Sequence, residues 1–419
     1  MTDLDSFSAL LTDEGPALLA SLRDYDPAQE LAVATRLRRA YPVELVTAAL
    51  AQARLRQRAV AKFGAEDAYR MFFTPNGVEQ STRRSVAEHR ARRLAELDVR
   101  SVADLCCGIG GDAIALARAG ISVLAVDRDP LTAAVAGANA VALGLSDLIE
   151  VRCADVQEID TAPYSAPSNA APSDTAPSGT APSDAASHGA VFVDPARRGG
   201  RGRIFNPEAY SPPLSWATEA VRGGTGAIKI APGIPHEMIP ADAEAEWISD
   251  GGDVKEAVLW FGTRPGLRRA TLLPSGAVLT GRGLPDPPVR PLGRYLYEPD
   301  GAVIRAHLVA EAAEELDGGL IDETIAYITA DELRPTPYAT AYEITDALPF
   351  GLKKLKALLR EREVGNLTVK KRGSAVEPEE VRRKVKPQGP NAATVFLTRV
   401  AGAPTMLVGR PATAVTPGR

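Results

Sequence analysis

The sequence is poor in the residues that build disulfide scaffolds and metal sites. Its 419 residues include three cysteines (Cys106, Cys107 and Cys153) and four scattered histidines. The cysteines are too few for a disulfide framework and lack the spacing of metal ligands. We therefore expect neither structural disulfides nor a metal site.

Long apolar runs and an overall positive charge are also missing. No apolar run reaches the roughly 18 residues of a membrane span. The N-terminal MTDLDSFSALL is acidic and lacks the basic start of a signal peptide. We therefore expect a soluble, cytoplasmic protein with no membrane partner. With a net charge of −5, nucleic-acid affinity requires a local basic patch.

The pattern of apolar residues changes near residue 100. Residues 1–95 are rich in Ala, Leu and Arg at helical spacing, which predicts a helical N-terminal region. From residue 96 to 282, short apolar runs alternate with helical stretches, which predicts an α/β domain with a parallel sheet. We expect 256–262 and 268–276 to form an antiparallel pair that closes this sheet.

An Ala/Pro/Ser tract interrupts the α/β region. Residues 165–184 read as four tandem pentapeptides, from SAPSN to TAPSD, and cannot bury a core. We predict a disordered insertion over 161–188. A Pro-rich linker opens a smaller α+β region at 283–340, and a basic module follows at 341–419.

A glycine-rich segment, DLCCGIGGD at 104–112, follows the first predicted strand and opens a helix. Gly108 and Gly110 let the backbone pass close under a ligand, and the helix N-terminus presents free N–H groups. Asp127 ends the next strand, where a carboxylate can accept both ribose hydroxyls. Asp155 follows the third strand, within reach of an adenine amine.

This segment is compatible with two cofactors, a dinucleotide and S-adenosylmethionine. Gly108, Gly110 and Ala113 match the dinucleotide fingerprint, and Asp127 stands where that fingerprint has its ribose carboxylate. Asp104 favours S-adenosylmethionine, because its carboxylate can accept from the ammonium of the methionine moiety. A pyrophosphate would be repelled by Asp104 and Asp112. In a third interpretation, Asp104 only orients the loop.

A second motif, Asp194-Pro195-Ala196-Arg197-Arg198, ends the fourth predicted strand. Ligands of open α/β sheets bind beyond the carboxyl ends of the strands. The Asp194 carboxylate and the Pro195 carbonyl can accept hydrogen bonds from a planar amine beside a methyl donor. The alternative is a strand-ending turn without chemistry.

Together these motifs resemble the class I S-adenosylmethionine-dependent methyltransferases over residues 100–280. The resemblance rests on DLCCGIGGD, AVDRD, CADV and DPARR in this order. It implies a Rossmann-like fold and a cofactor site of Asp104, Cys106, Gly108, Gly110, Asp127 and Asp155. In amino methyltransferases, the motif after the fourth strand reads Asp-Pro-Pro-aromatic. In this chain, the third and fourth residues of that motif are Ala196 and Arg197. The C5-uracil enzymes, which DPAR also resembles, need a later cysteine, and none follows Cys153.

The flanking segments extend the resemblance. FFTPNGVEQST at 72–82 and VAEHRA at 86–91 are similar to a signature of actinobacterial methyltransferases with a THUMP-like domain. Residues from 341 resemble that domain, and a ferredoxin-like stretch precedes it. A turn and helix over 74–80 can form a lid that brings Thr74, Glu79 and Gln80 to the methionine moiety. It can equally be a capped helix entry.

The C-terminal segment 351–387 is strongly basic, with twelve Lys or Arg against five Glu. Clustered cations are what phosphate contacts require. THUMP domains bind RNA, mainly tRNA, so the resemblance agrees with the charge; a solvated surface is the alternative. The candidate RNA contacts are Lys353, Lys354, Lys370, Lys371, Arg372, Arg383 and Lys384.

These features predict an enzyme that methylates a nucleobase nitrogen in structured RNA, with tRNA favoured. Asp194 and Pro195 would orient the acceptor amine. Arg197 or Arg198 would contact an RNA phosphate or an acceptor oxygen. Two alternatives stay open: a small-molecule methyltransferase and a non-catalytic RNA-binding protein.

Overall fold

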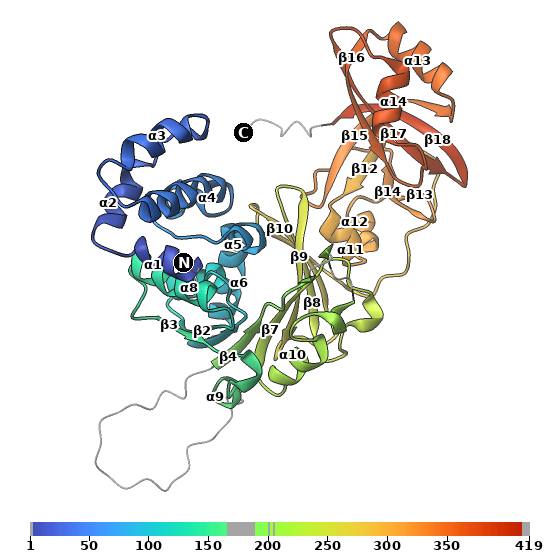
Figure 1. Ribbon diagram of the computed structural model, residues 1–419. Coiled ribbons are helices and arrows are strands. Elements are labelled where there is room, and N and C mark those ends of the chain that lie inside the picture. The colour runs from blue at the N-terminus through green and yellow to red at the C-terminus, as the bar shows by residue number, and fades with distance from the viewer. Residues whose placement is uncertain (1–2, 166–188, 200–201, 204–205, 413–419) are drawn as a thin grey trace, which may run out of the picture. The chain divides into compact units, whose positions relative to one another are not determined.

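The computed structural model describes residues 3–165, 189–199, 202–203 and 206–412. The chain divides into two compact units (Figure 1). Unit 1 comprises Met1–Glu244 and Ala257–Pro265, and unit 2 comprises Ala245–Glu256 and Gly266–Arg419. Most of the predicted insertion lies outside the described residues. Its first part corrects the prediction, because Ala162–Ser165 form the short helix α9.

Helices form the first part of unit 1, as predicted. They are α1 (Asp3–Ala9), α2 (Glu14–Ser21), α3 (Glu30–Leu37), α4 (Val43–Ala68), α5 (Pro75–Gln80) and α6 (Arg84–Glu96). The long helix α4 buries Leu45, Ala49 and Ala53, which recur at the four-residue spacing of one helix face. Among the described residues, no helix is both long and apolar enough to span a membrane.

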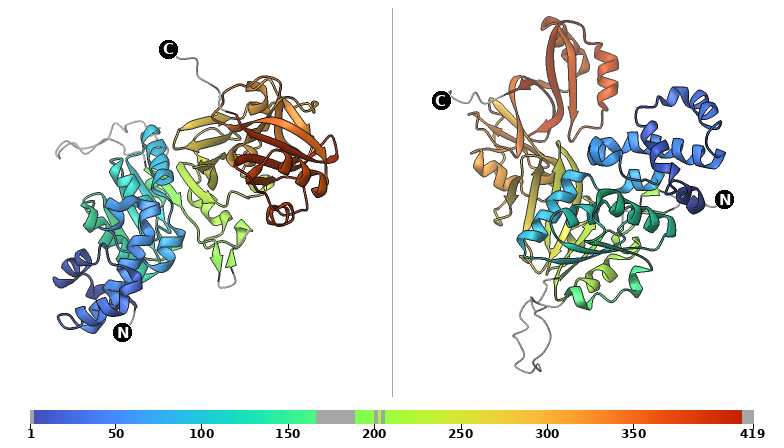
Figure 2. Two further views of the ribbon diagram at one scale, coloured as in Figure 1. Left: turned by 90° about the horizontal axis from the view of Figure 1, so that it is seen from above. Right: turned by 90° about the vertical axis from the view of Figure 1, so that its left-hand side faces the viewer.

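The strands of unit 1 follow the order β9-β7-β4-β1-β2-β3 within a nine-stranded sheet, and unit 1 includes β9 from Ala257 onward. The strands are β1 (Ser101–Leu105), β2 (Ser122–Asp127), β3 (Ile149–Cys153), β4 (Gly189–Val193), β7 (Thr225–Ile230) and β9 (Asp253–Phe261). Their pairs are parallel, except that β9 runs antiparallel to β7. Helices α7 (Gly111–Arg118) and α8 (Pro130–Leu143) cover one face, and α9 and α10 (Leu214–Ala220) cover the other (Figures 1 and 2). The predicted α/β class with a Rossmann-like sheet is confirmed.

Short elements connect these strands. They are the two-residue strands β5 (Arg198–Gly199) and β6 (Gly202–Arg203), and the 3-10 helices η2 (Val156–Glu158), η3 (Pro207–Ala209) and η4 (His236–Met238). A further 3-10 helix, η1 (Pro27–Gln29), lies between α2 and α3. Local sequence sets the helix ends. Before α8, the Asp129 carboxylate accepts from the backbone N–H of Thr132 at 2.8 Å, and Pro130 opens the first turn. Gly144, with φ of 73°, ends this helix.

Unit 2 begins with strands that correct one expectation. They are β8 (Glu244–Asp250), β10 (Arg268–Leu273) and β11 (Ala277–Thr280). The predicted pairing of 256–262 with 268–276 is wrong, because β9 pairs with β7 whereas β10 pairs in parallel with β8. Strand β8 escaped prediction because Glu244 and Glu246 interrupt its apolar pattern, although both side chains are buried.

A seven-stranded sheet with the order β13-β14-β12-β15-β18-β17-β16 completes unit 2. Its strands are β12 (Tyr295–Pro299), β13 (Gly319–Asp322), β14 (Ile325–Ala330), β15 (Ala339–Pro349), β16 (Val364–Lys371), β17 (Asn391–Val400) and β18 (Ala403–Pro411). Helices α11 (Gly301–Arg305), α12 (Val309–Glu315), α13 (Leu352–Glu361) and α14 (Pro378–Val385) join them. Strand β12 pairs with both β14 and β15, so 295–330 and 339–411 share one sheet.

Two apolar clusters stabilise this sheet. In the first, Leu355 and Leu359 of α13 and Val381 and Val385 of α14 pack with strand residues such as Val395. The second cluster combines residues from both sides of position 339: Leu296, Ile321, Ile325, Tyr327, Tyr342, Phe396 and Leu407. The structure therefore builds the basic module and the strands before it around a shared core.

Candidate active site

The candidate site lies where the strand order of the unit 1 sheet reverses, between β1 and β4. In open α/β sheets, ligands bind at such a switch point, outside the carboxyl ends of the strands. Leu105 and Val193 are register partners at the ends of these two strands. Asp104 therefore belongs to the last part of β1, and Asp194 follows β4 directly.

The glycine loop after β1 leaves open space for a ligand. Gly108 has φ of 57°, and a Cβ built on it would meet no atom within 4 Å. Gly110, with φ of 86°, precedes α7, and its Cβ would lie 3.6 Å from the Cβ of Ala136. Positive φ at both positions favours glycine. The loop thus has room beside Gly108 for a ligand close to the backbone, and such a contact stays a prediction.

Asp127 ties the end of β2 to this loop. Its Oδ2 accepts from the backbone N–H of Gly108 and its Oδ1 from that of Asp129, each at 3.0 Å. Burial raises the pKa of the Asp127 carboxyl, although these two N–H groups act in the opposite direction. Each oxygen keeps a second lone pair, which a ribose hydroxyl could use.

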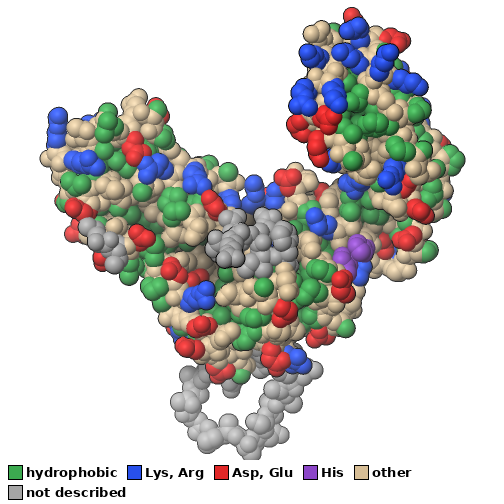
Figure 3. All heavy atoms as spheres, turned by 45° about the vertical axis from the view of Figure 1, so that its right-hand side comes forward, with side chains coloured by type: hydrophobic (Ala, Val, Ile, Leu, Met, Phe, Trp, Pro, Cys, Tyr) green, Lys and Arg blue, Asp and Glu red, His purple; other side chains and the backbone are tan. Residues whose placement is uncertain are grey.

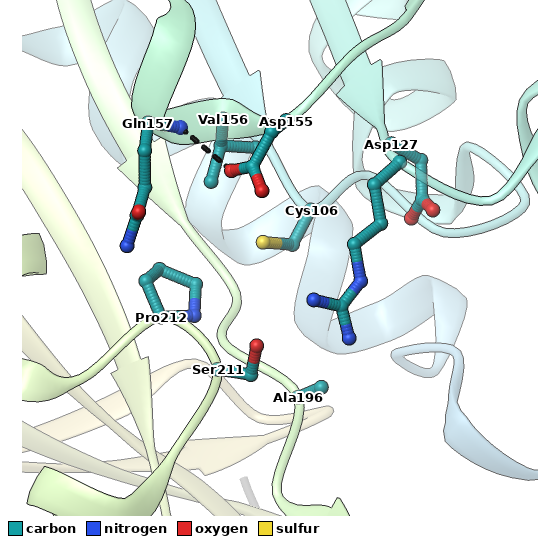
Figure 4. Close-up of a pocket in the computed structure, with 9 residues that line it drawn as sticks. Cys106, Asp127, Asp155, Val156, Gln157, Ala196, Ser211 and Pro212 are labelled. Atoms are coloured by element: carbon teal, nitrogen blue, oxygen red, sulfur yellow. Dashed lines mark hydrogen bonds between the residues drawn. The ribbon is translucent and has the colours of Figure 1, made fainter.

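A cavity of about 230 Å³ opens beside the loop. Its lining residues are Cys106, Asp127, Arg128, Asp155, Val156, Gln157, Ala196, Ser211 and Pro212. Cys106 and Asp155 lie on one side of it and Ser211 and Pro212 on the other (Figure 4). The Asp155 carboxylate accepts from the backbone N–H of Gln157 at 3.0 Å. The structure therefore brings together Cys106, Asp127 and Asp155, which are distant in sequence.

Cys106 does not have the character of a nucleophile. Burial raises the pKa of its thiol strongly, and the carboxylates of Asp194, Asp127 and Asp104 raise it further. A thiol in this environment stays protonated and packs as a small apolar group. Within the described part of the chain, no group of His, Cys, Asp and Glu side chains could hold a metal ion.

Asp104 is fully buried, and neither of its carboxylate oxygens has a hydrogen-bond partner among the described residues. Burial raises the pKa of this carboxyl well above its ordinary value, and Asp112 and Asp194 raise it further. An unpaired buried carboxyl is costly, so such a group calls for a partner. A ligand ammonium would supply one, and Asp104 thus fits the methionine end of S-adenosylmethionine.

The segment before α5 is held from two sides. The Gln52 side chain exchanges hydrogen bonds of 2.8 and 2.9 Å with the backbone of Phe73, and Asn139 bonds the backbone of Phe72 in the same way. Thr74 caps α5 by accepting from Gly77 N–H at 2.9 Å, while Gln80 is exposed at the other end. Thr74 thus has the geometry of a helix cap; its contact with a methionine moiety stays a prediction.

The motif Asp194-Pro195-Ala196-Arg197-Arg198 follows β4, and its Ala196 lines the cavity. The Asp194 Oδ2 accepts from Lys229 Nζ at 2.7 Å, and no other hydrogen bond to this carboxylate occurs within the described residues. Pro195 is buried, and Ala196 pairs with Ser211 through backbone hydrogen bonds. Arg197 is half-buried near Tyr210, whose pKa it lowers against the larger effect of burial.

Lys229 and Thr82 are the site residues that sequence reasoning missed. Lys229 stands in the apolar run GAIKIAPG, and a lysine inside a buried strand is a signal that could have found it. Thr82 ends the segment similar to the methyltransferase signature. Its hydroxyl donates to Asp112 at 2.7 Å and accepts from Lys229 at 2.9 Å.

The seven predicted RNA contacts fall into two groups. Lys353, Lys354 and Arg383 are exposed and make no ion pair or hydrogen bond with the described residues. The others have partners within unit 2: Lys370 with Glu298, Lys371 with Glu377, Lys384 with Glu380, and Arg372 over the ring of Tyr327.

Three protein families match parts of the chain. The RNA cap guanine-N2 methyltransferase family matches residues 99–193 and the THUMP domain-like family residues 339–411. A domain of unknown function matches residues 3–59. The first match includes the glycine loop, Asp127 and Asp155, and ends just before Asp194.

Relatives cover most of the chain. It is 32% identical over 356 residues to an S-adenosylmethionine-dependent methyltransferase of Mycobacterium tuberculosis, found in strains H37Rv and CDC 1551. The alignment covers 83% of this chain and 90% of each relative. The crystal structure of a methyltransferase candidate from Porphyromonas gingivalis W83 shares the fold, with a TM-score of 0.71 at 20% identity, over 93% of this chain and 100% of that one. The chain belongs to the S-adenosylmethionine-dependent methyltransferases and carries a THUMP-like domain.

Proposed function

We propose that this methyltransferase acts on a nucleobase nitrogen of structured RNA, and that tRNA is its acceptor. One observation carries the proposal: the Asp194-Pro195 edge follows the strand next to β1, and Ala196 of the same motif lines the cofactor cavity. A donor and a planar acceptor at these two places would lie beside each other at one end of the sheet.

The donor side follows from the geometry of the loop. The Asp104 carboxylate would accept from the ammonium, Asp127 from the ribose hydroxyls and Asp155 from the adenine amine. Gly108 and Gly110 would leave room for the chain between these groups. When bound, S-adenosylmethionine supplies a methyl group on a positive sulfur, and transfer leaves neutral S-adenosylhomocysteine while the acceptor nitrogen gives up one proton.

The acceptor side uses oxygen atoms as hydrogen-bond acceptors. The free oxygen of the Asp194 carboxylate and the Pro195 carbonyl would accept from an amine and hold its nitrogen toward the methyl group. Positioning of this kind supplies much of the rate in a displacement reaction. The guanine-N2 family match over 99–193 supports an exocyclic amine as the acceptor.

The RNA side rests on the basic module. Lys and Arg side chains gather over the THUMP-like end of unit 2 (Figure 3). Lys353, Lys354 and Arg383 lie there, exposed and without ion pairs in the described structure, and are therefore available to phosphates. Arg197 would contact the backbone near the reacting base. An RNA acceptor also agrees with the cytoplasmic location expected from the sequence.

Label transfer from tritiated S-adenosylmethionine tests this function. The acceptors are bulk tRNA from a strain that lacks the gene and bulk tRNA from the parent strain, whose sites are already methylated. We expect label on the first tRNA only, in one nucleoside identified by mass spectrometry. The variant Asp194→Ala should lose transfer while it keeps its affinity for the cofactor.

Other outcomes separate the alternatives. Label on ribosomal RNA alone would replace tRNA as the acceptor. Absence of label on any RNA, with cofactor binding intact, would refute the RNA function and favour a small-molecule acceptor.

A further inference from the structure

Lys229 is a buried cation next to Asp194. It is 3% exposed, and its ammonium donates to Asp194 Oδ2 at 2.7 Å and to Thr82 Oγ1 at 2.9 Å. The register explains the contact with Asp194: Val193 of β4 pairs with Ile228 of β7, and the next residues of the two strands are Asp194 and Lys229. Well-packed apolar residues often stabilise a core as well as a buried ion pair does. Stability alone therefore gives little reason for a lysine here.

The contacts of Lys229 continue to the helix behind the glycine loop. The Thr82 hydroxyl donates to Asp112 Oδ2 at 2.7 Å, and Asp112 lies in the first turn of α7. Arg90 of α6 forms an ion pair with the other Asp112 oxygen and lies 4.4 Å over the ring centroid of Phe192. One row of hydrogen bonds thus joins the acceptor motif to the helix that starts at the donor loop.

Two cations belong to this row, and Lys229 is the one that donates to the Asp194 carboxylate in the described structure. Arg90 is engaged by Asp112, so Lys229 holds Asp194. The Asp194 side chain is 24% exposed and would otherwise be free to rotate toward solvent. An acceptor group that must meet a reacting nitrogen loses rate when its position shifts by a small distance.

We propose that Lys229 is a positioning residue for methyl transfer. It fixes the Asp194 carboxylate at the acceptor edge, and Thr82 links that position to α7 and the donor loop. This role rests on the proposed transfer to a nucleobase nitrogen, in which Asp194 orients the acceptor. It concerns the catalytic step and not the binding of either substrate.

Two pairs of variants test the role. Lys229→Met removes the cation, and Lys229→Arg keeps it. Thr82→Val removes the hydroxyl with little change in shape, and Thr82→Ser keeps it. Lys255→Met is the matched control, because Lys255 pairs with Asp253 outside this row. Label transfer to tRNA gives kcat and KM, and calorimetry gives the Kd for S-adenosylmethionine.

We expect Lys229→Met to lower kcat about 10- to 100-fold while KM for RNA and the cofactor Kd change by less than about twofold. Lys229→Arg should recover part of the loss. Thr82→Val should lower kcat by about tenfold and Thr82→Ser should stay near wild type. Unchanged kcat in Lys229→Met, or a loss confined to the cofactor Kd, would overturn the proposal.

A structural readout keeps the test independent of the RNA function. Crystal structures of wild type and Lys229→Met with S-adenosylhomocysteine should differ by more than ~1 Å in the Asp194 carboxylate position. If wild-type protein labels no RNA, the proposed function fails, and this displacement alone decides the role of Lys229; an unmoved carboxylate overturns it. If Lys229→Met does not fold, the Thr82 pair decides, and equal kcat for Thr82→Val and Thr82→Ser refutes the proposal.

Discussion

Gly108 donates its backbone N–H to the carboxylate of Asp127, 19 residues later in the chain, at 3.0 Å. The residue expected to hold the ribose therefore also fixes the loop expected to pass under the cofactor. Removal of the Asp127 side chain would abolish both functions at once. A substitution that removes only its charge can separate them.

Replacing Asp127 tests this double role. Asp127→Ala should weaken S-adenosylmethionine binding about 10- to 100-fold, because it removes a charged acceptor and releases the loop. Asp127→Asn keeps one oxygen for the Gly108 N–H and should lose less. Calorimetry measures both. Equal losses in the two variants would show that the loop contact contributes nothing.

Asp104→Asn addresses the methionine end of the site. The amide keeps the shape but cannot pair with an ammonium, so we expect cofactor affinity to fall about 10- to 100-fold. The fold should not suffer, because the fully buried carboxyl has no hydrogen bond within the described structure to lose. Asp98→Asn, an exposed carboxylate paired with Arg100, is the control. An unchanged cofactor Kd in Asp104→Asn would refute the ammonium contact.

The raised pKa of Asp104 also predicts a pH dependence. Its ordinary value is 3.8, and burial shifts it upward in the folded protein. Since the ammonium needs the ionised carboxylate, cofactor binding should release a proton, and Kd should fall as pH rises, below the pH where the ammonium itself deprotonates. Calorimetry in buffers of different ionisation enthalpy detects the proton, and its absence would contradict the assignment.

The same shift gives the sign for stability. The folded state keeps this proton at pH values where the unfolded chain has lost it. The free energy of unfolding of the cofactor-free protein should therefore receive a contribution that falls as pH rises from 3.8 through the raised pKa. Urea unfolding of wild type and Asp104→Asn across this window measures it, and the variant should lack the decrease.

The two groups of basic residues should respond differently to substitution. Joint replacement of Lys353, Lys354 and Arg383 by alanine should weaken tRNA binding. It should also lower the slope of log K against log salt by about 2 to 3, at roughly 0.7–0.9 per lost phosphate contact. Cofactor Kd should stay unchanged. Gel-shift titrations over salt measure the slope, and a slope equal to wild type would argue for a merely solvated surface.

Lys370 should behave as a structural residue instead. Its ammonium pairs with Glu298 and lies 5.5 Å from the centroid of the Tyr342 ring. Lys370→Met leaves Glu298 partly buried without its partner, which we expect to lower the free energy of unfolding by about 1–2 kcal/mol. Thermal unfolding measures this loss, whereas the salt slope of RNA binding should not change. A changed slope at wild-type stability would move Lys370 to the RNA-binding group.

Sequence patterns predicted the parts of the fold that depend on local chemistry. The glycines at 108 and 110 and the carboxylates that end the strands indicated one site, because the ends of parallel strands meet at one edge. It was harder to predict which side chains pair with each other. Glu246 lies buried in β8, where it accepts from the Thr271 hydroxyl at 2.5 Å. Because the sequence did not indicate this distant partner, the glutamate did not fit the pattern of a buried strand.

The same limit applies to Lys229. Its neighbours in sequence are apolar, and its partners Asp194 and Thr82 come from 35 and 147 residues away. Charge pairing across strands is set by register, which no single segment encodes. The reverse holds for Lys370, Lys371 and Lys384, whose charge was evident but whose Glu partners were not.

The strand β12, before the THUMP-like match, pairs with β15, the first strand of that match. A fragment cut at residue 339 would leave Ala339–Glu343 of β15 without their β12 partner and split the cluster of Leu296, Tyr327, Tyr342 and Phe396. Such an edge invites aggregation. The basic module therefore cannot be transferred on its own. In evolution or in engineering, it has to move together with the strands from residue 295 onward.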